Sequence, residues 1–227
     1  MSGTLYIVAT PIGNLEDITL RAKRILGEVD LIAAEDTRHT RKLLSHFDIH
    51  TKLVSFSQHH EKGKKHKIVE ILKEGSDVAL VSDAGTPCIS DPGYPLMTAA
   101  IEEGITVVPV PGASAVITAL SAAGMPTDRF TFIGFLPEKS GKRAKVIESL
   151  KDYDHTLVFY LSKWKAAKQI TEMLELYGDR KACVARELTK VHEEFRREKL
   201  SSLAESLENN PPKGELVLVV SSAEEGI

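Results

Sequence analysis

The sequence predicts an α/β protein of two lobes, with a mostly parallel sheet in the N-terminal lobe, a mixed sheet in the C-terminal lobe and an active-site cleft between them. Three observations support this fold class. The 227 residues are 42% hydrophobic and 27% charged, which is enough to bury a large core. Short β-branched runs alternate with amphipathic segments in the first half. In the second half, two extended segments follow each other without a helix between them, which favours antiparallel pairing.

The N-terminal lobe is expected to span residues 1–112. Strict alternation of strand and helix implies right-handed crossovers and a sheet that helices cover on both faces. The predicted strands are residues 4–9, 30–34, 51–56, 77–82 and 105–110, and the predicted helices are residues 18–27, 39–47, 64–74 and 93–103.

The C-terminal lobe is expected to span residues 113–227, because the alternation of predicted strands and helices changes after Pro111. No flexible linker is visible at this boundary. Its predicted helices are residues 112–123, 140–150, 164–177 and 199–208. Its predicted strands are residues 130–135, 156–161, 180–186 and 215–220, with a further extended stretch at 190–196.

Charge and cysteine content restrict the class of protein. The net charge of −3 argues against a uniformly basic nucleic-acid wrapper and leaves local basic patches open. Cys88 and Cys183 have no C-x-x-C spacing, so we expect neither a zinc knuckle nor a disulfide framework. The N-terminal segment MSGTLYIVAT lacks the regions of a signal peptide, and Pro and Gly interrupt the longest uncharged stretch, so we expect no membrane span. A cytoplasmic protein fits these features.

Three turns that follow predicted strands are candidates for ligand binding: ATPIGNLEDIT at 9–19, SDAGTPCISDPGYP at 82–95 and VPVPGASAVITALSAAGMP at 108–126. Open α/β sheets bind ligands at the carboxyl ends of their strands. The first turn is either an ordinary strand-to-helix connection or a ligand loop. The density of Pro, Gly and Asp in the second favours a ligand site, where Asp83 and Asp91 either form local turns or accept hydrogen bonds from a ligand. The small residues of the third allow close approach of either backbone or ligand.

The segment AEDTRHTRKLL at 34–44 places Glu35, Asp36, Thr37 and Arg38 directly after a predicted strand. The two carboxylates beside the arginine either belong to a capping box or are acid/base and anion-binding groups. Thr37 is interpreted as a helix N-cap, whereas Asp36 and Arg38 are candidates for acid/base and anion-binding roles.

The segment ARELTKVHEEF at 185–195 is rich in charge but lacks the H-E-x-x-H spacing of a zinc site. We expect its charged residues to lie on a half-exposed strand face, and we assign no metal. These residues are Glu187, Lys190, His192, Glu193 and Glu194.

Two basic clusters, HHEKGKKHK at 59–67 and EKSGKRAK at 138–145, are open to two interpretations. They are either solvated surface, which is the usual case, or an electrostatic footprint for a phosphate backbone.

Taken in order, these segments, together with GFLP at 134–137, resemble the tetrapyrrole-methylase superfamily of S-adenosylmethionine (SAM) methyltransferases, which have two α/β lobes. The TPIGN turn replaces the glycine-rich first loop of the tetrapyrrole enzymes, and it is similar to the branch that methylates ribosomal RNA. The chain departs from the family pattern at FYLSKWK, residues 159–165, where members usually carry a Glu and a Pro-His pair. Relatives often continue beyond the last strand, so we expect some of their RNA-holding surface to be missing here.

The resemblance implies that a homodimer transfers a methyl group from SAM to the ribose 2′-hydroxyl of a cytidine in small-subunit (16S) ribosomal RNA. It implies that SAM lies between the lobes. The cofactor-binding residues would be Pro11, Asp83, Ala84, Gly85, Thr86, Ile89, Ser114, Ala115, Tyr160, Leu161, Ala185, Arg186, Lys213 and Gly214.

A ribose hydroxyl must lose its proton as it attacks, so a general base is expected beside it. The candidates for that base are Asp36, Asp91 and Glu187, with Arg38 or Lys190 orienting the adjacent phosphate. Two alternatives stay open: C-methylation of a tetrapyrrole precursor, and a catalytically silent module that binds SAM or a nucleotide.

Overall fold

The computed structural model of the protein describes residues 2–57 and 61–223, the side chains of residues 61 and 62 excepted. The chain divides into two compact units, Met1–Ser114 and Ala115–Ile227, and each unit has its own sheet.

The N-terminal unit is built on a parallel sheet with the strand order β3-β2-β4-β1-β5. Every residue of β2 and of β4 is buried, as expected for strands that helices cover on both faces. Because the strands are parallel, the turns that leave their carboxyl ends lie at one edge of the sheet. The strands are β1 (Thr4–Val8), β2 (Leu31–Ala34), β3 (Leu53–Ser55), β4 (Val78–Val81) and β5 (Thr106–Val110).

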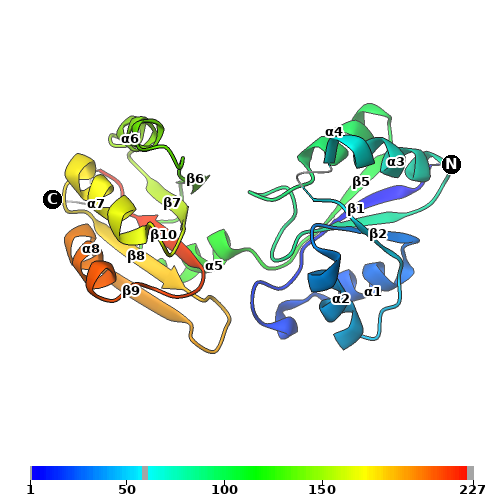
Figure 1. The fold of residues 1–227 in the computed structure, drawn as a ribbon, viewed down its shortest axis with the longest axis horizontal. Coiled ribbons are helices and arrows are strands. Elements are labelled where there is room, and N and C mark those ends of the chain that lie inside the picture. The colour runs from blue at the N-terminus through cyan, green and yellow to red at the C-terminus, as the bar shows by residue number, and fades with distance from the viewer. Residues whose placement is uncertain (1, 58–60, 224–227) are drawn as a thin grey trace. The chain divides into compact units, whose positions relative to one another are not determined.

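Helices cover both faces of this sheet (Figure 1). Helices α1 and α2 lie on one face and α3 and α4 on the other, which matches two separate apolar clusters in the core. The helices are α1 (Leu20–Glu28), α2 (Thr37–His46), α3 (Glu61–Lys73) and α4 (Tyr94–Glu102), and a short 3-10 helix, η1 (Leu15–Asp17), precedes α1. The sequence sets where α1 begins, because the Thr19 side chain caps it by accepting a 3.0 Å hydrogen bond from the Ala22 amide.

The C-terminal unit has a mixed sheet with the strand order β6-β7-β10-β8-β9. Only β6 and β7 are parallel; the other described pairs are antiparallel. The strands are β6 (Phe130–Phe135), β7 (Thr156–Leu161), β8 (Lys181–Arg186), β9 (Glu194–Lys199) and β10 (Leu216–Val220).

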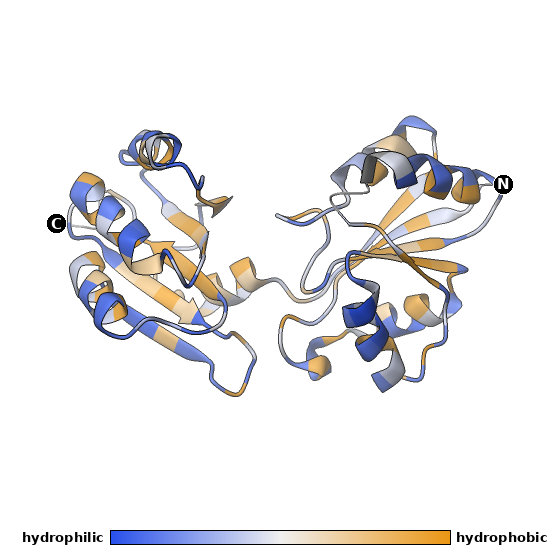
Figure 2. Ribbon diagram, viewed as in Figure 1, coloured by the Kyte–Doolittle hydropathy of each residue, from blue (hydrophilic) through white to orange (hydrophobic). Residues whose placement is uncertain are grey.

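Helices α6, α7 and α8 pack with the sheet of the C-terminal unit in one large apolar cluster, and α5 contacts β10 and β8. Figure 2 shows the apolar residues concentrated on the strands of each sheet. The helices are α5 (Ala115–Ala123), α6 (Ser140–Ser149), α7 (Ala166–Tyr177) and α8 (Leu200–Asn209).

The structure confirms the predicted α/β class, the parallel sheet and the mixed sheet, and it places most elements close to their predicted bounds. The exception is the extended stretch predicted at 190–196. Residues 187–193 form a turn, and the strand follows it at Glu194–Lys199. Glu187 and Thr189 have φ values of 50° and 65°, so the chain reverses there before it can pair with β8.

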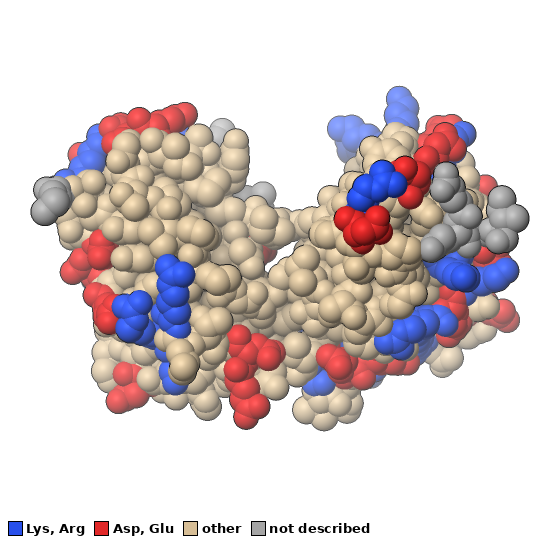
Figure 3. Space-filling model, turned by 180° about the vertical axis from the view of Figure 1, so that it is seen from behind, with Lys and Arg blue, Asp and Glu red and all other residues tan. Residues whose placement is uncertain are grey.

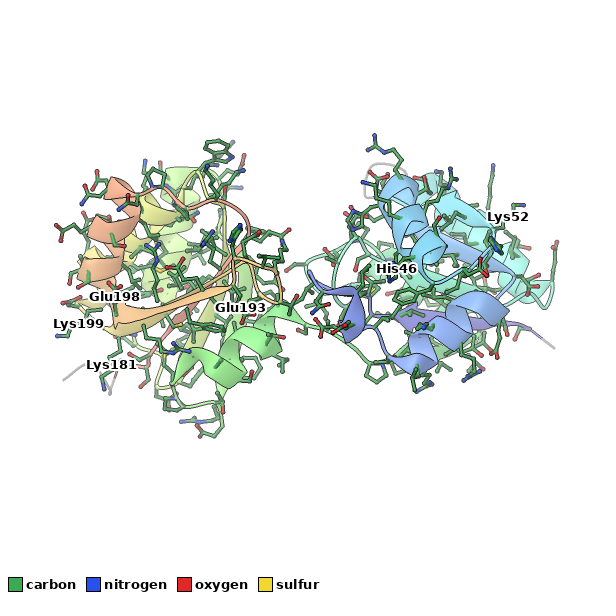
Figure 4. The ribbon with its side chains drawn as sticks, turned by 90° about the horizontal axis from the view of Figure 1, so that it is seen from below. His46, Lys52, Lys181, Glu193, Glu198 and Lys199 are labelled. Carbon is green, nitrogen blue, oxygen red and sulfur yellow. The ribbon has the colours of Figure 1, made fainter. Side chains whose placement is uncertain are left out.

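The hairpin of β8 and β9 ends at a sheet edge (Figure 4). Glu193 lies at one end of β9, while Glu198 and Lys199 lie at the other end, beside Lys181 of β8. Charged side chains on an edge strand oppose pairing with a further chain, and the sequence EFRREK of β9 fits that role.

Charges of both signs alternate in small groups over the face drawn in Figure 3, in keeping with the nearly balanced composition. In the described part of the chain, no helix is long and apolar enough to cross a membrane.

Candidate active site

Three turns of the N-terminal unit meet at the carboxyl edge of its sheet. Thr10, after β1, and Gly85, after β4, exchange two backbone hydrogen bonds of 2.9 and 3.0 Å. The Thr86 hydroxyl donates to the carbonyl oxygen of Ala113, after β5, at 3.3 Å. The turns that the sequence singled out after β1, β4 and β5 therefore form one connected cluster.

This cluster contains most of the residues predicted to bind the cofactor in the first half of the chain. Ala84 and Ile89 are exposed, whereas Gly85 is buried. Gly85 has a φ of +82°, and a Cβ there would approach Ile12 Cγ2 to 3.4 Å, so the turn favours glycine. The predicted residues in these turns are Pro11, Asp83, Ala84, Gly85, Thr86, Ile89 and Ser114.

The turn after β2 joins the cluster through carboxylates. The Asp36 amide donates to Asp83 Oδ1 at 3.0 Å, and the Asp83 amide donates to Glu35 Oε2 at 3.4 Å. Burial raises the pKa of Glu35, and the neighbouring charge of Asp83 raises it further. The sequence pointed to Glu35 and Asp36 as two carboxylates directly after a strand, but only Asp36 was chosen as a catalytic candidate.

Asp91 lies in the long turn between β4 and α4. Its carboxyl group is half-buried; burial raises its pKa and the charge of Asp83 adds to the rise, while a hydrogen bond with Ser82 opposes it. Cys88 and Ser90, which precede Asp91 in this turn, have φ values of 70° and 62°, a backbone conformation that residues with a side chain rarely adopt. Such strain persists only where the surroundings impose it and gathers at functional sites.

Asp36, and not Thr37, is the N-cap of α2, which corrects the sequence interpretation. Its side chain accepts a 2.8 Å hydrogen bond from the Arg38 amide and bonds the Arg38 guanidinium, with a shortest distance of 2.7 Å. These bonds lower the pKa of Asp36 and raise that of Arg38. Thr37 is the first residue within the helix, because an aspartate one position earlier is already placed to cap it.

A pocket of about 170 Å³ opens beside α2, between the turn after β1 and the end of β4. Its walls are partly apolar and partly polar. Thr40 is one of the lining residues, and its hydroxyl oxygen is buried without a hydrogen-bond partner among the described residues. The lining residues are Thr10, Pro11, Leu15, His39, Thr40, Lys42, Leu43, Ser82 and Asp83.

In the C-terminal unit, strand register aligns several predicted residues at one end of the mixed sheet. Leu161 of β7 and Arg186 of β8 both pair with Leu216 of β10. One position further in, Tyr160 and Ala185 both pair with the next residue of β10. Arg186 donates to the Lys213 carbonyl oxygen at 3.4 Å, which brings the Lys213–Gly214 turn to the same end. Ala115 is the first residue of α5.

Glu187 and Lys190, both predicted to be catalytic, are engaged in an ion-pair network at this end of the sheet. Lys190 Nζ lies 3.0 Å from Glu187 Oε1 and 2.9 Å from Glu215 Oε2. Burial opposes ionisation of Glu187, but hydrogen bonds from the Glu215 amide and from Lys190 outweigh it and lower the pKa of the Glu187 carboxyl. A Cβ at Gly214, whose φ is +87°, would overlap the Glu187 carboxylate, so this turn is built around the glycine.

The expectation that the charges of ARELTKVHEEF share a half-exposed strand face is wrong for most of them. Glu187, Lys190, His192 and Glu193 lie in the turn between β8 and β9, and only Glu194 lies in a strand. The positive φ values at the start of the turn break the period of two that a strand face requires. Within residues 2–57 and 61–223, no group of three or more His, Cys, Asp or Glu residues is arranged to hold a metal ion.

The basic cluster at 138–145 is not only solvated surface. Arg143 is buried and bonds Glu172 through Nε at 2.6 Å, and this pair holds α6 against α7. Of the cluster at 59–67, His59 and His60 lie outside the described residues, and Lys64 Nζ donates to the Ser55 carbonyl oxygen at 2.7 Å.

The departure at FYLSKWK leaves an aromatic ring at the surface. Trp164 is 83% exposed, and Lys163 Nζ lies 4.9 Å from the centre of its ring.

Over residues 4–204, the chain matches the family described as Tetrapyrrole (Corrin/Porphyrin) Methylases, and it belongs to that family. A protein of Halalkalibacterium halodurans named ribosomal RNA small subunit methyltransferase I is 51% identical over 96% of this chain and 75% of its own length. A protein of the same name from Streptococcus pyogenes serotype M1 is 49% identical over 98% of this chain and 78% of its own length.

Solved structures show the same fold at low sequence identity. The uroporphyrin-III C-methyltransferase of Thermus thermophilus, complexed with S-adenyl homocysteine, superposes with a TM-score of 0.69 at 18% identity and covers 98% of this chain and 99% of its own. The resemblance of the sequence motifs to the tetrapyrrole-methylase superfamily is thereby confirmed.

Proposed function

We propose that this chain uses SAM to methylate small-subunit ribosomal RNA at the 2′-hydroxyl of a cytidine ribose. The observation that carries the proposal is the identity of about half the residues, over nearly the whole chain, with relatives named ribosomal RNA small subunit methyltransferase I. The choice of a cytidine and of its 2′-hydroxyl rests on the resemblance of the motifs.

The residues at the carboxyl edge of the N-terminal unit have the chemistry that SAM requires. Asp83 offers a carboxylate to the donor groups of SAM, Thr86 offers a hydroxyl group, and Gly85 allows close approach to the backbone. Exposed Ala84 and Ile89 offer apolar surface. When bound, SAM supplies a methyl group made electrophilic by its sulfonium. That the predicted residues of the C-terminal unit contact the same SAM molecule stays a prediction of the sequence.

Asp91 is the best candidate for the general base. A half-buried carboxylate with a raised pKa accepts a proton more readily than an ion-paired one, and a positioned base contributes roughly 10²–10⁴ to the rate. Asp36 is bound to Arg38, and Glu187 is bound to Lys190, so both of these carboxylates are weaker bases. Their lowered pKa values favour structural roles over proton transfer.

Arg38 is the better placed of the two cations proposed to orient a phosphate. Its side chain is 88% exposed and is paired with one carboxylate among the described residues, whereas Lys190 is bound to two. A guanidinium can bond a phosphate through two nitrogen atoms and still keep a contact with Asp36.

We also propose that the protein acts in the cytoplasm as a homodimer. The wide separation of Cys88 and Cys183 in the sequence and the lack of a C-x-x-C spacing favour a reducing compartment. Sedimentation equilibrium tests the dimer, and a mass equal to one chain at micromolar concentration would exclude it.

One experiment separates the proposed function from its two rivals. The protein is incubated with methyl-labelled SAM and, in separate reactions, with unmethylated small ribosomal subunits, with naked small-subunit ribosomal RNA and with a tetrapyrrole precursor. We expect label in RNA. Label in the tetrapyrrole would replace the proposal with C-methylation, and SAM binding without transfer to any acceptor would identify a silent module.

A further inference from the structure

The pocket beside α2 differs in size from a cofactor site. Its volume of about 170 Å³ is several times the roughly 30 Å³ that one water molecule occupies. Pockets that hold a drug-sized molecule, such as whole SAM, measure about 300–1,000 Å³. The pocket therefore fits a fragment of the size of one heterocyclic ring, and it is too small for a tetrapyrrole.

The lining of the pocket fits a ring that also carries hydrogen-bonding groups. Leu15 and Leu43 supply apolar surface, Ser82 and Asp83 supply polar groups, and Thr40 also lies in the wall. Thr40 is 2% exposed and its hydroxyl oxygen has no partner among the described residues. A buried polar group without a partner is costly, so native proteins rarely keep one unless something else satisfies it.

The surface around the pocket is cationic. Helix α2 has the sequence TRHTRKLLSH, which contains no acidic residue. Arg38 is paired with Asp36, but Arg41 and Lys42 are exposed and make no ion pair within residues 2–57 and 61–223. Lys42 also lines the pocket, so an anion next to a bound ring would lie beside an unpaired positive charge.

We propose that this pocket binds one unstacked nucleotide of the RNA substrate, with its base in the pocket and its phosphates beside Lys42 and Arg41. Single-stranded RNA is recognised in this way, by bases turned out into pockets and by cations along the backbone. The inference rests on the proposed function, because it assumes that RNA is the substrate. It adds a substrate subsite on α2, outside the residues predicted to bind SAM except for Pro11 and Asp83 in the wall.

The test uses Thr40→Val, which keeps the shape of the side chain and removes only the hydroxyl group. The variant of the 227-residue chain is compared with wild type in four measurements: affinity for a small-subunit ribosomal RNA transcript, affinity for polyphosphate, affinity for SAM and the midpoint of urea unfolding. We expect the Thr40 side chain to turn its buried hydroxyl group toward the bound base, so that RNA binds the variant about three- to tenfold more weakly once that hydrogen bond is lost. Affinity for SAM should not change, and the unfolding midpoint should stay the same or rise, because an unpartnered buried hydroxyl group is removed.

Lys42→Gln tests the cationic part of the subsite against a matched control. We expect the slope of log affinity against log salt concentration to fall by about one, as for the loss of one phosphate contact. The control is Lys52→Gln, because Lys52 (Figure 4) is exposed in the same unit but precedes β3 at the amino edge of the sheet. This control should keep the wild-type slope.

The outcomes distinguish the subsite from the proposed function. If wild type methylates the transcript but Thr40→Val and Lys42→Gln bind it as tightly as wild type, the subsite is wrong and the function stands. A loss of SAM affinity in Thr40→Val would assign the pocket to the cofactor and overturn the inference. If wild type methylates neither the transcript nor unmethylated small ribosomal subunits, the proposed function itself fails. Polyphosphate carries phosphates but no bases, so its binding separates the base contact from the phosphate contacts. Thr40→Val should leave the affinity for polyphosphate unchanged. An equal loss of affinity for polyphosphate and for the RNA transcript would contradict a base-binding pocket.

Discussion

The predicted site residues lie at one end of each sheet, and the pKa values of the carboxyl groups at these two ends are shifted in opposite directions. At the carboxyl edge of the parallel sheet, Glu35 and Asp91 are half-buried, and burial raises the pKa of each. At the corresponding end of the mixed sheet, Glu187 is bound to Lys190 and to the Glu215 amide, and its pKa is lowered. The difference suggests a division of labour between the two units, meaning that their carboxylates have different roles. The N-terminal unit supplies the proton acceptor, whereas the ion pairs of the C-terminal unit stabilise the turn at 187–193.

The largest effect that this comparison predicts is on catalysis. Asp91→Asn should lower the single-turnover rate of methylation at saturating SAM and RNA by about 100-fold or more, because the base is lost. Glu187→Gln, the matched change at the other edge, should alter the rate only a few-fold. Equal losses in both variants would remove the proposed division of labour.

The pH dependence of the rate sharpens the same comparison. Burial raises the pKa of Asp91 above its ordinary value of 3.8. The basic form is therefore lost as the pH falls through that raised value, and the wild-type rate should fall with it. Asp91→Asn should show no such decrease. A pH profile that is identical in wild type and variant would exclude Asp91 as the titrating base.

The same raised pKa predicts how stability responds. A carboxyl group whose folded pKa lies above its unfolded value stabilises the fold below the unfolded pKa, and this stabilisation is lost as the pH rises through the folded pKa. Asp91→Asn, which carries no charge at any pH, should thus be at least as stable as wild type at pH 7 in urea unfolding. A clear loss of stability at that pH would show that the carboxylate has a structural role.

At the edge of the C-terminal unit, Gly214→Ala should mainly affect folding. The added Cβ overlaps the Glu187 carboxylate at a φ of +87°, and we expect a loss of about 1–3 kcal/mol in the free energy of unfolding. Gly141→Ala is the control, because it lies in α6 with no atom within 4 Å of the added Cβ. That change should stabilise by up to about 1 kcal/mol. Urea unfolding followed by circular dichroism measures both, and the proposed packing of this turn requires that Gly214→Ala be the less stable.

The smallest expected effect is that of Lys190→Gln. Its partly exposed ion pairs contribute at most about 1 kcal/mol to stability. Because the folded pKa of Glu187 is lowered, its contribution is present above the unfolded pKa of 4.5 and is lost as the pH falls through the folded pKa. The difference in the free energy of unfolding between wild type and Lys190→Gln should therefore shrink as the pH falls below 4.5. Lys145→Gln, an exposed change in α6, should have the stability of wild type both at neutral pH and in acid. A difference that grows in acid would contradict the assigned pairing.

The sequence predicted the elements well because its signals there are local. The alternation of apolar strands with amphipathic helices fixes the parallel sheet, and Pro95 in the first turn of α4 marks where the long turn ends. The turn at 187–193 was not predicted because Glu187 and Thr189 adopt left-handed backbone conformations, which neither glutamate nor threonine favours.

The site was predictable only in part, because what decides it acts between distant residues. Asp83 and Asp91 were identified from the composition of their turn. The burial that raises the pKa of Asp91, while that of Asp36 is lowered, arises from tertiary packing and is not visible in the sequence. Thr40 was not singled out, since a threonine in a helix gives no sign that it lines a pocket or that its buried hydroxyl group has no partner among the described residues.

Ribose methylation is tested most directly by alkaline hydrolysis of RNA labelled by the enzyme. Hydrolysis needs a free 2′-hydroxyl group at each linkage, so a methylated ribose protects the linkage that follows it. After transfer from methyl-labelled SAM to unmethylated small-subunit ribosomal RNA, we expect the label in an alkali-resistant dinucleotide that begins with cytidine. Label released in mononucleotides would place the methyl group on a base. Absence of label from the RNA, both naked and in assembled small subunits, would contradict the proposed activity altogether.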